Sequence, residues 1–188
     1  MDMPAGSNNL PPQILIVPGL FGSGPEHWQS QWERQQPSFR RVEQSNWNTP
    51  VCAEWLNVLD KEIRAKKDNV ILVGHSLGAV TIAHWALSYN RRIAGALLVA
   101  PSDTDAATFP GGTSGFAPMP SCRFPFASTV IASTNDPYMD FERTEVLAKV
   151  WGSHFVGLGE HGHISTADGF GPWPEGLLSL DRFRGATY

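Results

Sequence analysis

The sequence predicts a compact, three-layer α/β fold, with about six mostly parallel strands and helices on both faces of the sheet. Short apolar runs alternate along the chain with stretches of helical period, as in chains built from strand–helix–strand units. The runs at 14–17 and 70–73 are continuously apolar, which is typical of strands buried on both faces. At 188 residues, of which 41% are hydrophobic and 17% charged, the chain suits a single domain.

The elements follow one another in regular order. Residues 1–12 contain Pro, Gly, Ser and Asn and are expected to form a flexible N-terminus, with the domain covering 13–188. The stretch 101–125 is rich in Pro, Gly, Ser and Thr and has no period, which predicts a long ordered loop or a minimal lid but no large cap domain. Strands are expected at 14–17, 41–44, 70–73, 94–99, 127–132 and 154–158, and helices at 26–35, 51–65, 77–88, 140–151 and 175–184.

Charge and composition exclude several classes of function. The net charge of −4 and the scattered basic residues give no footprint for nucleic acid or for an anionic membrane. No apolar stretch reaches the roughly 18 residues of a membrane span, and the N-terminus lacks the features of a signal peptide. We therefore expect a soluble cytoplasmic protein. Its two cysteines, Cys52 and Cys122, have no metal or redox spacing and are expected to be free thiols.

The segment Gly74-His-Ser-Leu-Gly78 is the strongest indication of chemistry. It follows the apolar run 70–73 and leads into a predicted helix. In this context G-x-S-x-G forms the nucleophile elbow of α/β-hydrolases, a sharp turn that exposes a serine hydroxyl at the end of a central strand. Ser76 is therefore the candidate nucleophile. A serine becomes nucleophilic only when a base takes its proton and when donors receive the charge that develops on the substrate.

The chain order Ser, acid, His limits where the base can lie. His161 and His163 both follow the last predicted strand, at the edge of the sheet where a catalytic histidine must sit. We prefer His163 because Gly162-His163-Ile164 has the common Gly-His-apolar form, and His161 remains the alternative. The spacing His161-x-His163 also suggests a metal, but no third ligand stands at a recognisable distance, so no cofactor or metal is expected.

The acid is expected directly after the strand at 127–132. Asp136 stands there, followed by Pro137, and would accept the imidazole N–H and so fix the tautomer of the base. Asp140 is the competing acid, although either aspartate is equally suited to cap the helix that follows.

Two backbone N–H groups should form the oxyanion hole. One belongs to Leu77, directly after the nucleophile, and the other to the loop 18–22 after the first strand, where Leu20 is preferred and Phe21 is second. The same loop carries glycines at 19, 22 and 24, but their spacing differs from a dinucleotide-binding fingerprint and no acidic residue follows the next strand. A nucleotide-binding fold is therefore disfavoured.

These residues predict acyl transfer to water through an acyl-enzyme, with a small-molecule ester or amide as substrate. Short acyl esters are favoured because no cap domain is expected. A peptidase or amidase with the same triad, and a non-catalytic hydrolase scaffold that binds another protein, remain alternatives. Four aromatic residues are candidates to line an acyl pocket, or else belong to the core: Phe21, Phe116, Phe170 and Trp173.

The chain resembles the small serine hydrolases of the retinoblastoma-binding protein 9 type. The resemblance rests on the segment 17–29, which contains Gly-Ser-Gly-Pro-Glu-His-Trp, on the elbow, on 136–143, and on 162–176, which ends in Trp-Pro-Glu-Gly. It extends from about residue 14 to 180. The resemblance implies a small α/β-hydrolase that begins at what is normally the third strand, with Ser76, Asp136 and His163 as the triad. It names no physiological substrate.

Overall fold

The computed structural model describes residues 11–184; the greater part of the expected flexible N-terminus, residues 1–10, lies outside them. The strands are β1 (Gln13–Val17), β2 (Phe39–Arg41), β3 (Val70–His75), β4 (Gly95–Val99), β5 (Ser128–Ala132) and β6 (His154–Gly157). The helices are α1 (Trp28–Gln35), α2 (Cys52–Ala65), α3 (Leu77–Tyr89), α4 (Phe141–Trp151), α5 (Pro174–Leu178) and α6 (Asp181–Arg184), with short 3₁₀ turns at Leu20–Gly22 and Thr166–Asp168.

The six strands form one sheet in the order β2-β1-β3-β4-β5-β6, and every neighbouring pair is parallel. This confirms the predicted fold class. The central strands β3 and β4 are buried along their whole length, because helices cover both faces of a parallel sheet. All carboxyl ends therefore meet at one edge, where ligands bind in sheets of this kind.

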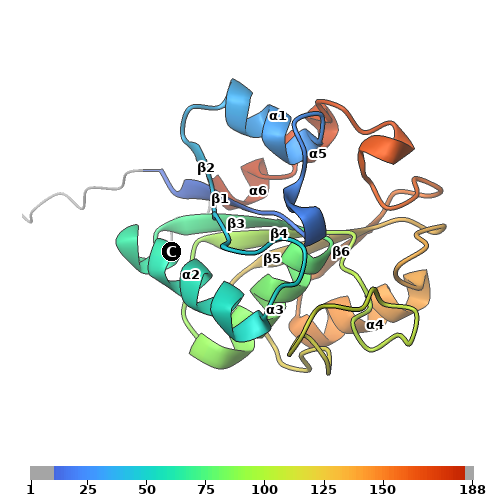
Figure 1. Ribbon diagram of the computed structural model, residues 1–188. Helices are drawn as coiled ribbons and strands as arrows, with labels where there is room; N and C mark the ends of the chain where they lie inside the picture. The colour runs from blue at the N-terminus through green and yellow to red at the C-terminus, as the bar shows by residue number, and fades with distance from the viewer. Residues whose placement is uncertain (1–10, 185–188) are drawn as a thin grey trace, which may run out of the picture.

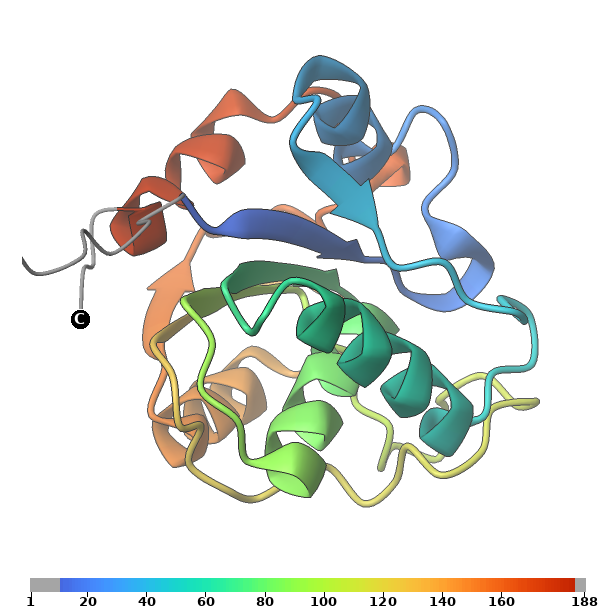
Figure 2. The same ribbon diagram turned by 90° about the vertical axis from the view of Figure 1, so that its left-hand side faces the viewer.

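Helices α2, α3 and α4 cover one face of the sheet, and α1, α5 and α6 cover the other (Figures 1 and 2). Helix α3 lies under the centre of the sheet and is buried continuously from Leu77 to Ala86, which explains why it lacks a polar face. Within residues 11–184, no helix combines the length and the apolar composition that a membrane crossing requires.

Two elements differ from their expected bounds. The edge strand β2 lies at 39–41 rather than 41–44. Its start is anchored by the buried side chain of Phe39, and after its last residue the N–H of Val42 still donates to the carbonyl of Ile16 in β1. The expected helix 175–184 is split into α5 and α6. The N–H of Ser179 donates to the carbonyl of Gly176, and the N–H of Leu180 donates to that of Leu177. These tight turns end α5 and direct the side chain of Leu180 into the core.

The segment 101–125 contains no helix or strand, as expected, and its only ladder contact with the described part of the chain is an isolated bridge between Val51 and Ser114. Buried side chains nevertheless fix it to the core on the face that α2, α3 and α4 cover, among them Phe116, Met119 and Phe124, which stacks on Trp151 of α4. The loop is thus ordered by apolar anchors, and it passes the carboxyl edge of the sheet at Phe109 and Pro110.

Candidate active site

A cavity of about 280 Å³ opens at the carboxyl edge of the sheet. Its walls come from segments that are far apart in the sequence: the loop after β1, the turn between β3 and α3, and the loops after β4, β5 and β6. Ser76, Leu77, Leu20 and His163 all line it, so the structure brings the predicted nucleophile, one predicted base and both preferred amide donors to one place.

Ser76 sits between β3 and α3 with φ 57° and ψ −125°. A non-glycine residue rarely adopts positive φ, and such strain persists only where the surrounding structure imposes it. Here the N–H of Ser76 bonds to the carbonyl of Val99 on β4, and its own carbonyl accepts from Ala79 and Val80 in α3. The strand and the helix thus hold the hydroxyl out at the sheet edge.

Two glycines permit the close packing that this turn needs. A Cβ on Gly78 would collide with the carbonyl oxygen of Val17 at the end of β1. A Cβ on Gly19 would lie 2.9 Å from the Cβ of Ser76 and 2.9 Å from the carbonyl oxygen of His75. Glycine at both positions therefore lets the loop after β1 approach the turn at Ser76 at backbone distance.

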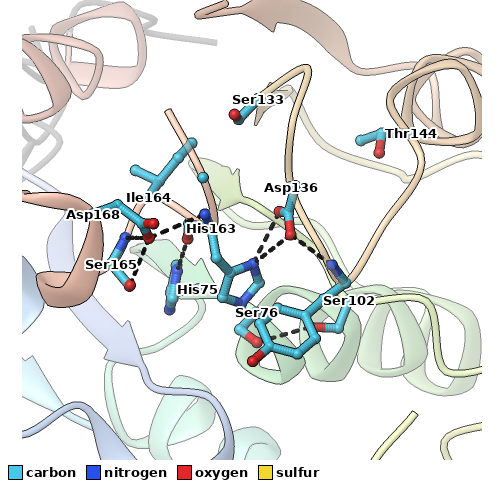
Figure 3. Close-up of polar contacts among 12 residues, drawn as sticks. His75, Ser76, Ser102, Ser133, Asp136, Thr144, His163, Ile164, Ser165 and Asp168 are labelled. Carbon is cyan, nitrogen blue, oxygen red and sulfur yellow. Dashed lines mark hydrogen bonds and ion pairs between the residues drawn. The ribbon is translucent and has the colours of Figure 1, made fainter. Parts of the chain in front are cut away.

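His163 and Asp136 form a close pair. The Nδ1 atom of His163 lies 2.9 Å and 3.0 Å from the two carboxylate oxygens of Asp136 (Figure 3). The side chain of Asp136 is 3% exposed and that of His163 is 12% exposed. A carboxylate only accepts, so Nδ1 carries the proton and Nε2 is left free to take one. Figure 3 shows the imidazole of His163 between Asp136 and Ser76.

The loop that carries His163 is fixed on three sides. The carboxylate of Asp168 accepts from the N–H of His163 at 3.0 Å, and His75 Nε2 bonds to the carbonyl of His163 at 2.9 Å. The indole N–H of Trp28 bonds to the carbonyl of Ile164, the next residue, at 2.9 Å. Neither Trp28 nor Asp168 was predicted to have a role. Trp28 belongs to the sequence motif Gly-Ser-Gly-Pro-Glu-His-Trp, but its partner lies 136 residues further along the chain.

The amide groups near Ser76 differ in availability. Among the described residues, neither the N–H of Leu20 nor that of Leu77 has a hydrogen-bond acceptor, and both residues line the cavity. The N–H of Phe21, the second choice for the oxyanion hole, instead bonds to the carbonyl of Trp47 at 3.0 Å. The N–H groups of Leu20 and Leu77 are therefore available as hydrogen-bond donors at the cavity, whereas that of Phe21 is not.

The competing acid, Asp140, and the competing base, His161, have other contacts. Asp140 caps α4, where its carboxylate accepts from the N–H of Arg143. His161 is exposed, and its ring packs against Phe170. Within residues 11–184, no group of three or more His, Cys, Asp or Glu side chains is arranged to hold a metal ion.

Of the four aromatic residues considered for the pocket, only Phe21 lines the cavity, where it is 70% exposed. Phe116 is buried against Trp55 and His84 in the core below α2 and α3. Phe170 and Trp173 pack on each other, and Trp173 also packs on α1. The structure does not bring these three to the cavity, because their side chains fill the layers beside the sheet.

Ser102 and Tyr138 line the cavity and contact Ser76 and His163, although the sequence singles out neither of them. Ser102 follows β4, and its Oγ lies 2.8 Å from Ser76 Oγ. Tyr138, two residues after Asp136, packs its ring edge-on against His163 with the centroids 4.6 Å apart. No motif marks Ser102; the position of β4 beside β3 brings it to Ser76.

Three histidine rings lie in a row along the cavity, tilted against one another, with His75 between His27 and His163 at centroid distances of 4.7 and 4.9 Å. Burial lowers the pKa of His27 to about 4, helped by the charges of Arg41 and His163. Burial also lowers the pKa of His75 well below its usual value, with His163 and His27 adding to the effect. Both rings are therefore neutral at pH 7.

This row predicts acid sensitivity. The unfolded chain binds a proton at His27 near pH 6.5, whereas the folded protein does so only near pH 4. Stability is thus fully present above pH 6.5 and falls as pH drops toward 4, by an amount on the order of 3 kcal/mol for His27. The variant His27→Asn keeps a helix-capping side chain but cannot titrate. Urea unfolding from pH 7.5 to 4.5 should show a shallower loss for the variant, and parallel curves would contradict a lowered pKa at His27.

The parallel sheet, the strained serine turn and the histidine–carboxylate pair at one sheet edge define an α/β-hydrolase. Residues 14–182 match the protein family described as serine hydrolase, and the chain belongs to that family. A search of curated proteins finds no match.

Solved structures agree with this assignment. A crystal structure described as a YdeN-like hydrolase from Pectobacterium atrosepticum is 35% identical and has a TM-score of 0.80, covering 92% of this chain and 90% of that one. The ydeN gene product of Bacillus subtilis is 22% identical with a TM-score of 0.75, covering 92% and 98%. An esterase from Thermogutta terrifontis is 16% identical with a TM-score of 0.63, covering 90% and 88%. The last two similarities concern the fold.

Proposed function

We propose that the protein hydrolyses carboxylic esters of small, uncharged acyl groups through a Ser76–His163–Asp136 triad and an acyl-enzyme. The observation that carries the proposal is the convergence of a strained serine and a carboxylate-bound histidine on one cavity. The motifs at 17–29 and 162–176 further support a place among the small serine hydrolases of the retinoblastoma-binding protein 9 type.

The first half of the reaction transfers the acyl group to the enzyme. His163 Nε2 takes the proton of Ser76 while Ser76 Oγ bonds to the carbonyl carbon, and the carbonyl electron pair moves onto oxygen. The N–H groups of Leu20 and Leu77 receive that charge. Collapse expels the alkoxide, which leaves with the proton from His163. In the second half, water attacks the acyl-enzyme while His163 takes its proton, and collapse of the intermediate returns that proton to Ser76 Oγ and releases the carboxylic acid. Asp136 stays ionised and stabilises the imidazolium.

The cavity restricts the substrate. Its volume of about 280 Å³ lies near the lower limit of ligand pockets, which span roughly 300–1,000 Å³. Within residues 11–184, no Asp, Glu, Lys or Arg is among the residues that line it, and apolar side chains from Leu20, Phe21, Phe109 and Pro110 form much of the wall. An anionic acyl chain would lose its hydration here without gaining a partner.

A panel of 4-nitrophenyl esters tests the proposal. We expect turnover of the butyrate ester, with kcat/KM roughly a hundredfold higher than for the hemisuccinate, which has a chain of similar length that ends in a carboxylate. The palmitate ester should react more slowly than the butyrate, and so should butyryl 4-nitroanilide. Preference for the anilide would indicate an amidase, and no turnover of any compound would contradict hydrolysis.

A further inference from the structure

Ser102 contacts the nucleophile directly. Its side chain is buried, and its Oγ lies 2.8 Å from Ser76 Oγ (Figure 3). Among the described residues this is the only hydrogen-bond partner of the Ser102 hydroxyl. Ser76 and Ser102 thus place two mutually hydrogen-bonded hydroxyl groups on the wall of the same cavity.

The backbone around Ser102 is fixed on both sides. The N–H of Ala100 bonds to Ile131 on β5 at 2.8 Å, and the N–H of Asp103 bonds to the carbonyl of Tyr138 at 2.9 Å. The carboxylate of Asp103 also pairs with Arg143 in α4 at 2.8 Å. The loop after β4 is thus tied to the acid loop and to α4, so the hydroxyl of Ser102 is held in place beside Ser76.

The number of protons decides the direction of the bond. Ser76 has one hydroxyl proton, and attack on a carbonyl requires that proton to go to His163. Ser76 Oγ can then only accept from Ser102, which must be the donor. If Ser76 donates to Ser102 instead, its proton points away from the base and no attack follows.

We propose that Ser102 is a catalytic residue that donates a hydrogen bond to Ser76 Oγ and stabilises the negative charge on that oxygen during attack. This inference rests on the proposed function. During the step, the Ser76 proton moves to His163, the new bond joins Ser76 Oγ to the carbonyl carbon, and the carbonyl electron pair moves onto oxygen. Ser102 keeps its own proton throughout. The same donor assists when Ser76 Oγ leaves in deacylation.

The test compares Ser102→Ala and Ser102→Thr with the wild type and with a matched control. Ser128 forms the control pair: its Oγ lies 2.6 Å from Ser153 Oγ, it is also buried, and it begins β5 at the end of the strand remote from the cavity. Ser128→Ala removes the same kind of bond without touching Ser76. The measurements are the second-order rate of fluorophosphonate labelling, kcat/KM for 4-nitrophenyl butyrate, and the melting temperature.

We expect Ser102→Ala to lower the labelling rate and kcat/KM together, by roughly tenfold to a hundredfold, because both report attack by Ser76 Oγ and a donor to a developing anion is lost. Ser102→Thr should recover most of the rate. Ser128→Ala should lower the melting temperature about as much as Ser102→Ala while both rates stay at the wild-type value.

Labelling of Ser102→Ala at or above the wild-type rate would overturn the role of Ser102, and the proposed function would stand. A loss of rate in Ser128→Ala that equals the loss in Ser102→Ala would also overturn it, since the effect would then follow stability. A wild-type protein that neither labels nor hydrolyses the ester would instead overturn the proposed function, and the role of Ser102 with it.

Discussion

Ser76→Ala is expected to lower kcat for 4-nitrophenyl butyrate by roughly 10⁵-fold to 10⁶-fold, the loss typical of removing a serine nucleophile. The fold should survive, because serine and alanine both carry a Cβ and place the same strain on a backbone with φ 57°. The hydrogen bonds that fix the turn come from the backbone and are unchanged by the substitution. Steady-state kinetics and a thermal melt, run side by side, measure both parts of the expectation.

Ser128→Ala is the matched control for this variant, since it removes a buried serine hydroxyl far from the cavity. It should hydrolyse the ester at the wild-type rate. A Ser76→Ala protein that folds and keeps more than about one per cent of the activity would exclude Ser76 as the sole nucleophile.

His163→Ala is expected to have a nearly equal effect, roughly 10⁵-fold or more on kcat, because the members of a triad act as a unit. His161→Ala is its matched control, two residues earlier in the same loop. The ring of His161 packs on Phe170 and does not line the cavity, so its loss should leave kcat within about twofold of the wild type.

Activity that survives in His163→Ala but disappears in His161→Ala would reverse this assignment. It would require His161, which is exposed in the structure, to turn toward Ser76. Equal and partial losses in both variants would point to a disturbed loop instead. Rescue by added imidazole separates these cases, because a small base can replace a missing ring but cannot rebuild a loop.

The fold was predictable because its strands are short, continuous apolar runs. The runs at 14–17, 70–73 and 94–99 carry no helical period, and the structure places all three at the centre of the sheet. The bounds of β2 and of the last helix were less predictable. Phe39 anchors β2 two residues before the expected start, and a turn at Ser179 divides the last helix, since neither feature depends on periodicity.

The site was predictable to the extent that chain order limits it. A serine turn after one strand, an acid after a later strand and a histidine after the last must meet at one edge of a parallel sheet. Ser102 escaped prediction because its contact with Ser76 depends on β4 lying next to β3, which no motif encodes. Phe116 and Trp173 illustrate the converse: an aromatic residue near a site in sequence fills the core as readily as it lines a pocket.

The proposed mechanism requires Ser76 to carry the acyl group. The most direct test is intact mass and peptide mapping of the protein after treatment with a fluorophosphonate. We expect one adduct per wild-type chain, mapped to Ser76, and none on Ser76→Ala. An adduct on a different residue, or equal labelling of the wild type and Ser76→Ala, would rule out Ser76 as the nucleophile.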